Sequence, residues 1–389
     1  MNSTCIPSVR FGLTKTISVA LLFTCTVAQT FAADDELNVA APSDVGLDAS
    51  KLHEVAARIR SNPNINIHSV LVVKDNKLVF EEYFSGKDQN WGEDLGVVKY
   101  DSDLLHDMRS VSKSITSALI GIAISEGKIA GIDASVFDLF PDYLDQLAPD
   151  KESLTLHHIL TMSAGLDWFE PIDYTNPGND EIRMIGSPDP VAFTLGRSLR
   201  NEPGQGFQYN GGLPTLLGHL LEKGYGKSGD QIAKEKLFDP LGIESFEFHS
   251  NSSGMLAYAS GLRLTPRDMA KIGMLYVNDG KWREEQIIPA DWVEASLKPH
   301  LESSFTPGYG YQWWIMRFDS EHESIWVPAA IGNGGQRIFI LQPYDMVVVV
   351  TAGNYNTSDV ELRGSDILME YVFPSLGLLE MRFVPASGN

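Results

Sequence analysis

The chain has 389 residues, 43% of them apolar, and a formal net charge of −21 at pH 7. This length and composition suffice for the core of one large domain or two closely packed ones. The acidic charge argues against binding to nucleic acid or to an anionic bilayer, because both surfaces would repel the chain.

Residues 1–32 have the pattern of a secretory signal peptide. Arg10 and Lys15 form a basic start, an apolar run follows over residues 17–28, and small residues close the segment. The apolar run is too short for a comfortable transmembrane span. We therefore expect a bacterial protein of the periplasm or the medium, with no membrane insertion after the signal is cleaved.

The positions of the two cysteines agree with the expected export of the protein. Both cysteines, Cys5 and Cys25, fall inside the expected signal peptide. The mature protein would therefore contain no disulfide and no thiol chemistry.

The first elements of the mature chain are predicted from caps and turns. Residues 47–61 predict a helix, with Asp48 or Ser50 as its cap. Residues 69–83 contain β-branched and aromatic side chains on either side of Asp75–Asn76, which predicts a β-hairpin with its turn at these two residues.

A buried helix and a long helical region follow. Residues 110–126 carry apolar side chains at helical spacing. Residues 130–245 predict helices and loops interrupted by prolines. Thr265 then begins a helix as a capping residue, with proline at the first helical position. Three late segments predict strands: residues 309–315, 337–341 and 346–351.

This order of elements predicts a mixed α/β (α+β) fold, in which an antiparallel sheet is flanked by helices and carries an inserted, mostly helical part. We assign residues 33–389 to one unit. Its sheet-containing part would comprise residues 33–108 and 246–389, and its helical part residues 109–245. Two parts joined without a linker would leave a cleft, which is a common ligand site.

The most informative motif is Ser110-x-x-Lys113 at the start of the buried helix. Residues three apart share one helical face, so a hydroxyl and an amine would lie side by side at the positive helix end. That arrangement suits an activated serine nucleophile. A second match, Ser125-x-x-Lys128, lies at the far end of the same helix, where Gly127 indicates the C-terminus.

Two further stretches could complete a catalytic site. A glycine-rich loop presents Tyr209, whose pKa would fall beside the Lys113 ammonium, so that the phenol could act as a proton shuttle. A second glycine-rich turn, residues 332–335, runs into a strand and allows close backbone approach. The backbone amides of Gln336 and Ser110 are candidate oxyanion donors.

These three stretches, in this order, resemble the serine β-lactamase and penicillin-binding family. The likeness covers nearly the whole mature chain. It is closest to the class C-like branch that holds esterases and 6-aminohexanoate-dimer hydrolases. The resemblance implies acylation of Ser110 by a small-molecule amide or ester, with Lys113 and Tyr209 handling protons. It also implies no metal and no other cofactor.

The resemblance also implies a set of substrate-binding residues. These are Asn210 of the second motif, Asn333, Gly334 and Gly335 of the third, and Tyr174, a loop tyrosine that closes over substrate in the nylon-oligomer hydrolases.

The chain departs from the family pattern twice. Gly211 stands where the second motif has asparagine, and Asn333 stands where the third motif begins with lysine or histidine. That cation holds the substrate carboxylate in β-lactamases and carboxypeptidases, so the neutral Asn333 argues against efficient β-lactam hydrolysis. Arg337 could supply a cation if its strand turned the side chain toward the site.

Other readings remain open. A β-lactamase or a penicillin-binding DD-carboxypeptidase is the alternative enzyme, and a non-catalytic binding protein on the same fold is the alternative of another class. His157 and His158 look like a metal pair, but they fall within an apolar helical stretch without a third ligand, which favours a structural role. The sequence leaves the oligomeric state open.

Overall fold

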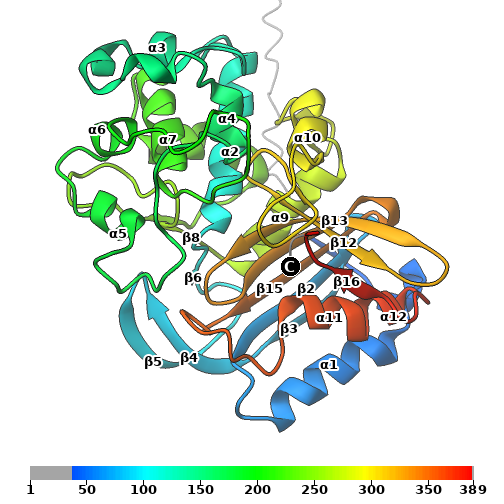
Figure 1. Cartoon of the computed structure of the whole chain (residues 1–389). Coiled ribbons are helices and arrows are strands. Elements are labelled where there is room, and N and C mark those ends of the chain that lie inside the picture. The colour runs from blue at the N-terminus through cyan, green and yellow to red at the C-terminus, as the bar shows by residue number, and fades with distance from the viewer. Residues whose placement is uncertain (1–36, 388–389) are drawn as a thin grey trace, which may run out of the picture. The chain divides into compact units, whose positions relative to one another are not determined.

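Sixteen strands and twelve α-helices lie within residues 37–387, the part of the chain that the computed structural model describes (Figure 1). The expected signal peptide, residues 1–32, lies outside these residues. The strands are β1 (Asn38–Val39), β2 (Ile67–Lys74), β3 (Lys77–Tyr83), β4 (Ser85–Asn90), β5 (Glu93–Lys99), β6 (His106–Asp107), β7 (Glu247–Phe248), β8 (Leu262–Leu264), β9 (Lys281–Trp282), β10 (Glu285–Gln286), β11 (Gly308–Tyr309), β12 (Trp314–Asp319), β13 (Ser324–Gly332), β14 (Gln336–Leu341), β15 (Met346–Ala352) and β16 (Arg382–Val384). The α-helices are α1 (Ala49–Ser61), α2 (Val111–Ser125), α3 (Val136–Leu139), α4 (Leu156–Leu160), α5 (Asp180–Ile185), α6 (Pro190–Leu195), α7 (Gly212–Tyr225), α8 (Gly229–Ala233), α9 (Pro266–Val277), α10 (Ala290–Leu297), α11 (Gly364–Ile367) and α12 (Phe373–Ser375).

A nine-stranded sheet organises the described residues. Its strand order is β1-β3-β2-β15-β14-β13-β12-β11, with β16 also paired to β12. All of these pairs are antiparallel except β1 with β3. The predicted class, a sheet flanked by helices in a mixed α/β fold, is confirmed, and the parallel β1 makes the sheet mixed.

Helices cover both faces of this sheet. On β15, Val347 and Val349 belong to the core shared with α2 and α9, whereas Val348 and Val350 belong to the core shared with α1 and α12. Because both faces of the strand are buried, its sequence is a continuous apolar run rather than an alternating one. Helix α2 packs on β13 and β14 on one side and on α7 on the other, so it joins the sheet to the helices α3–α7, drawn in green (Figure 1).

The elements predicted from local signals are confirmed. Asp75 and Asn76 have positive φ values of 50° and 58°, as a two-residue hairpin turn between twisted strands requires. The Asp48 side chain accepts the backbone N–H of Ser50 at 2.9 Å and caps α1. The Thr265 hydroxyl accepts the backbone N–H of Asp268 at 3.1 Å and caps α9.

One predicted strand is wrong, and one hairpin was missed. The segment 309–315 is not continuous, because the chain turns at Gln312, where φ is 65°, and resumes as β12. The buried Gln312 side chain donates to the carbonyl groups of Ile159 and Leu160, which holds this turn. The β4–β5 hairpin was missed because its strands are polar and exposed and therefore lack the apolar alternation of a half-buried sheet.

None of the helices between Leu37 and Ser387 combines the length and the apolar character that crossing a bilayer requires.

Loss of the Thr265 cap should destabilise the fold by about 1 kcal/mol. Thr265→Ala removes the oxygen that accepts the Asp268 N–H, whereas Thr265→Ser keeps it. Urea unfolding of the two variants would measure the difference. Equal free energies of unfolding for the alanine and serine variants would contradict the capping role.

Candidate active site

The nucleophile candidate Ser110 lies where a short strand turns into α2. Strand β6 pairs with β8, and the Met108 N–H continues this pairing by donating to the Leu262 carbonyl at 2.9 Å. Arg109 then takes a left-handed backbone, with φ of 48°, and Ser110 is the N-cap residue of α2. The hydroxyl is thereby presented at the first turn of a buried helix.

The left-handed backbone conformation of Arg109 is stabilised by contacts of its side chain. A non-glycine residue at positive φ carries conformational strain, which persists only where the surroundings fix it. The Arg109 guanidinium pairs with the buried Asp107 at 3.0 Å and lies over the Tyr355 ring, 4.9 Å from its centre. Asp107 also pairs with Arg263 at 3.0 Å, which links the nucleophile turn to β8.

Lys113 lies directly against the serine. Its side chain is 1% exposed, and its Nζ donates to Ser110 Oγ at 2.9 Å and to the Ala259 carbonyl at 2.9 Å. The competing motif has no such environment, because the exposed Ser125 donates its hydroxyl to the Ile122 carbonyl at the end of α2. The structure therefore brings only the first serine–lysine pair into a site.

Tyr209 lies beside Lys113, but its pKa is shifted in the direction opposite to the predicted one. The Lys113 Nζ lies 5.0 Å from the centre of the Tyr209 ring, and the Trp314 ring stacks on the tyrosine at 5.5 Å. Burial raises the pKa of Tyr209 well above 10, nearby Glu170 adds to this, and a hydrogen bond with Ser110 opposes it. The predicted lowering of the Tyr209 pKa is therefore wrong, and the phenol stays neutral at ordinary pH.

Two buried carboxyl groups beside Ser110, Lys113 and Tyr209 were missed by the sequence analysis. Glu170 accepts from the Trp168 indole at 2.7 Å, from the Gly211 N–H at 2.7 Å and from the Tyr174 hydroxyl at 2.8 Å. Burial and the neighbouring Glu181 raise the pKa of Glu170 to about 8. Glu170 is therefore protonated at neutral pH, although its sequence context, a proline-rich loop, gave no signal of this role.

Glu181 explains one departure from the family pattern. A Cβ at Gly211 would lie 2.3 Å from Glu181 Oε2, so the glutamate fills the space that a side chain at position 211 would take. The Ser260 hydroxyl donates to Glu181 Oε1 at 3.1 Å. In the sequence, Glu181 follows the capping residue Asn179 and reads as an ordinary acidic residue of a first helical turn.

The glycine-rich turn of the third motif packs against the segment that precedes Ser110. A Cβ at Gly332 would lie 2.4 Å from the Met108 carbonyl oxygen, so only glycine permits this approach. Gly334 and Gly335 have φ values of 97° and 110°. The buried Gln336 amide exchanges hydrogen bonds with the backbone of Ala352, at 2.8 and 3.0 Å, and fixes the turn on β15.

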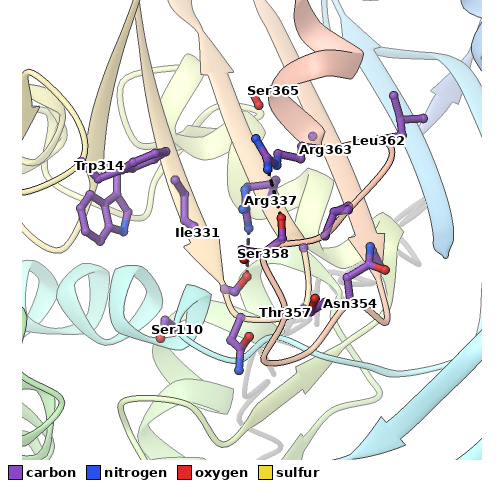
Figure 2. Close-up of a pocket in the computed structure, with 18 of the residues that line it drawn as sticks. Ser110, Trp314, Ile331, Arg337, Asn354, Thr357, Ser358, Leu362, Arg363 and Ser365 are labelled. Carbon is purple, nitrogen blue, oxygen red and sulfur yellow. Dashed lines mark hydrogen bonds between the residues drawn. The ribbon is translucent and has the colours of Figure 1, made fainter. Parts of the chain in front are cut away.

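Two cavities meet at Ser110. The larger, of about 500 Å³, is lined by Tyr209, Trp314 and the glycine turn (Figure 2). The smaller, of about 240 Å³, lies on the side of Glu181. Three residues line both cavities: Ser110, Tyr174 and Asn333.

Asn210 is placed differently from the other expected binding residues. It is 2% exposed, accepts the Gly212 N–H at 2.8 Å at the start of α7, and is absent from the walls of both cavities. Asn333 lines both cavities, and its side chain exchanges hydrogen bonds with Asn356 at 2.7 and 3.0 Å.

Trp314 is a further aromatic residue of the site. Its neighbour Trp313 is fully buried against Tyr276, whereas Trp314 lines the larger cavity and stacks on Tyr209.

His157 and His158, the two histidines that resemble a metal pair in the sequence, each lie within hydrogen-bond distance of a hydroxyl group. His157 Nδ1 lies 3.2 Å from the Tyr311 hydroxyl, and His158 Nδ1 lies 3.0 Å from that of Thr155. Within the described residues, the buried side chains of His68, Asp88 and His106 offer ligand atoms within 4.8 Å of one another. His68 Nδ1 and His106 Nε2 are only 2.8 Å apart, which is a hydrogen-bond distance. Two nitrogen ligands of a tetrahedral zinc ion lie farther apart, at about 3.3 Å.

Glu170 should make the stability of the protein fall with rising pH. Its pKa is about 8 when folded against an ordinary value of 4.5, so the folded state binds more protons between these values, and stability is lost as pH rises through that window. Glu170→Gln removes this dependence. Relative to wild type, the variant should gain a few kcal/mol between pH 5 and about 8.5.

Thermal unfolding across this pH range would measure the gain. Glu244→Gln, at an exposed site, is the control and should run parallel to wild type. A parallel curve for Glu170→Gln as well would contradict the buried, protonated carboxyl.

Comparison with known proteins agrees with this geometry. Residues 56–369 match the protein-family model described as Beta-lactamase. The 6-aminohexanoate-dimer hydrolase of Paenarthrobacter ureafaciens is 23% identical over 303 residues, which cover 72% of this chain and 70% of that protein. The lovastatin esterase of Penicillium rubens is 28% identical over 140 residues, covering 34% of this chain and 33% of the esterase.

The fold itself recurs in solved structures. The octameric penicillin-binding protein homologue from Pyrococcus abyssi superposes with a TM-score of 0.62 at 22% identity, covering 86% of this chain and 78% of that one. The family expected from the three motifs is confirmed. Because the family model spans most of the chain and its relatives are hydrolases, the chain belongs to the β-lactamase family of serine hydrolases.

Proposed function

We propose that the protein is an exported serine hydrolase that cleaves a small amide or ester through an acyl-enzyme on Ser110. The observation that carries this proposal is the 2.9 Å contact between Ser110 Oγ and Lys113 Nζ at the junction of two cavities. Export rests on the signal-peptide pattern of residues 1–32. The names of the relatives, an amide-dimer hydrolase and an esterase, agree with this substrate class.

In the proposed acylation step, Ser110 Oγ attacks the substrate carbonyl and gives its proton to Lys113 Nζ. Lys113 is the group closest to the serine proton, and proton acceptors must lie within hydrogen-bond reach. The oxyanion would be held by the backbone N–H groups of Ser110 and Gln336. When the carbonyl re-forms, the bond to the leaving group breaks.

Tyr209 serves in this scheme as a proton donor. Its raised pKa keeps the phenol protonated, and its hydrogen bond with Ser110 places the proton at the reacting atoms. Tyr209 therefore protonates the departing amine or alcohol, and the Lys113 ammonium returns a proton to Tyr209. Water then hydrolyses the acyl-enzyme by the reverse sequence of transfers.

The two cavities suggest how the substrate is held. Ser110 lies between them, so the parts of the substrate on either side of the scissile bond would occupy one cavity each. Tyr174 lines both cavities and donates to the buried Glu170, which supports a role for its ring in covering the bound substrate.

Ser110→Ala should abolish hydrolysis of small esters and should not react with a fluorophosphonate probe. Intact mass spectrometry should show one adduct on the wild-type protein and none on this variant, because the variant lacks the nucleophilic oxygen.

Ser125→Ala is the matched control, since it removes the serine of the competing motif at an exposed site. It should label and hydrolyse like wild type. An adduct on Ser110→Ala would remove the assignment of Ser110, and the absence of any adduct on the wild type would favour a binding protein on the same fold.

Tyr209→Phe should lower the acylation rate by about a hundredfold or more, because proton transfer to the leaving group is lost. The stacking on Trp314 and the contact with Lys113 are kept by the phenyl ring. The burst phase of a p-nitroanilide, whose amine leaving group must be protonated before it departs, would measure the rate. Tyr276→Phe, which changes a buried tyrosine outside the site, is the control. A near-normal rate for Tyr209→Phe would show that Lys113 alone handles the protons.

A further inference from the structure

A buried cluster of two histidines and an aspartate lies outside the candidate active site. His68 comes from β2, Asp88 from β4 and His106 from β6, and each of the three residues is at most 4% exposed. Their ligand atoms lie within 4.8 Å of one another, and none of the three lines either cavity at Ser110. The acyl-enzyme proposal therefore gives this cluster no role.

The outer nitrogen of each imidazole is committed as a hydrogen-bond donor. His68 Nε2 lies 3.2 Å from Asn66 Oδ1, and Asn66 Nδ2 donates to the Lys87 carbonyl at 2.9 Å. Because Asn66 turns its amide nitrogen to that carbonyl, its oxygen faces His68, and Nε2 carries the proton. His106 Nδ1 lies 3.1 Å from the Asp107 carbonyl oxygen, which can only accept, so Nδ1 carries the proton of the second ring.

The inner nitrogens of the two rings therefore face each other with lone pairs. A neutral imidazole has a single N–H, and both rings use theirs outward, so His68 Nδ1 and His106 Nε2 are both acceptors. These two atoms are 2.8 Å apart. Burial lowers the pKa of His68 to about 3 and also lowers that of His106, which disfavours an additional proton on either ring. Two lone pairs at this distance repel each other unless a cation binds both.

Asp88 adds a carboxylate to the same set of ligand atoms. Its Oδ2 lies 3.6 Å from His106 Nε2. Two phenols orient it: the Tyr355 hydroxyl donates to Oδ1 at 2.8 Å, and the Tyr100 hydroxyl donates to Oδ2. Hydrogen bonds to the outer nitrogens of histidines and to a carboxylate are the contacts that orient the ligands of a metal ion. The cluster therefore has both the ligand atoms and the supporting contacts of a metal site.

The spacing of the two nitrogens indicates which ion fits. Nitrogen ligands lie about 2.0 Å from a divalent transition metal, so two ligands at a right angle are about 2.8 Å apart. His68 Nδ1 and His106 Nε2 have this separation, which is too short for the tetrahedral angle of zinc. Right-angled nitrogen and oxygen ligands are typical of the square-planar and tetragonal sites of Cu(II) and Ni(II).

We propose that His68, His106 and Asp88 form a buried binding site for a divalent ion with right-angled ligands, Cu(II) or Ni(II). The ion supplies the positive charge that the facing lone pairs require, and it joins β2, β4 and β6. The site is independent of the proposed acyl-enzyme. It braces the nucleophile turn, because the Tyr355 ring, whose hydroxyl is held by Asp88, lies 4.9 Å from the Arg109 guanidinium.

The test offers Cu(II), Ni(II) or Zn(II), as the chloride salt in slight excess, to chelator-treated wild-type protein. Each ion is supplied to the folded protein and, in a parallel sample, during refolding from urea, because the cluster is closed to solvent. After gel filtration, elemental analysis should find about one Cu(II) or Ni(II) per chain and less Zn(II). The bound ion should raise the melting temperature by about 4 °C or more, since it binds only the folded state.

The Cu(II) complex of the unaltered protein identifies the ligands without relying on a variant. Its electron paramagnetic resonance spectrum should be axial, as in a tetragonal site, with hyperfine coupling to two nitrogens. A different number of coupled nitrogens, the spectrum of aqueous Cu(II), or tighter binding of Zn(II) than of Ni(II) would overturn the proposal.

Variants of the cluster and of a second histidine pair provide the matched comparison. His68→Gln and Asp88→Asn each remove one ligand and should weaken Cu(II) binding by about tenfold or more. His158→Gln alters the other adjacent histidine pair, at a partly exposed site, and should bind Cu(II) like wild type. Unchanged affinity in both cluster variants, or an equal loss in His158→Gln, would remove the site from this cluster.

Discussion

A buried amine sets the arrangement of the whole site. Lys113 is almost completely buried on α2, and its amine has two oxygen partners, Ser110 Oγ and the Ala259 carbonyl. The Tyr209 ring lies 5.0 Å from this amine, and the buried Glu170 interacts with it electrostatically. The loop of Glu170, helix α5 with Glu181 and the segments around Tyr209 and Ala259 must therefore pack around one amine, and this packing assembles the site.

The sequence was sufficient to predict the elements whose structure is determined by neighbouring residues. The serine–lysine pair spans one helical turn, and the Asp75–Asn76 hairpin and the Thr265 cap are each fixed by neighbouring residues. Glu170 escaped prediction because its role depends on a loop folded onto a helix that comes later in the chain. The error on the Tyr209 pKa has the same origin: the sequence suggested the ammonium but not the burial or the carboxyl groups, which outweigh it.

One departure from the family pattern is compensated from elsewhere in the chain. The space left by Gly211 is filled by Glu181, which comes from α5. A motif read position by position cannot show such an exchange, because the substituting side chain lies 30 residues away in sequence.

The close approach of Gly332 to Met108 has a consequence for biosynthesis. The nucleophile turn is complete early in the chain, yet the turn that packs against it is held on β15, which pairs with both β2 and β14 in the middle of the sheet. Contacts between such distant segments form late, because closing long loops costs entropy before the contacts are gained. The surroundings of Ser110 are therefore not assembled in a nascent chain until residues 346–352 have been synthesised.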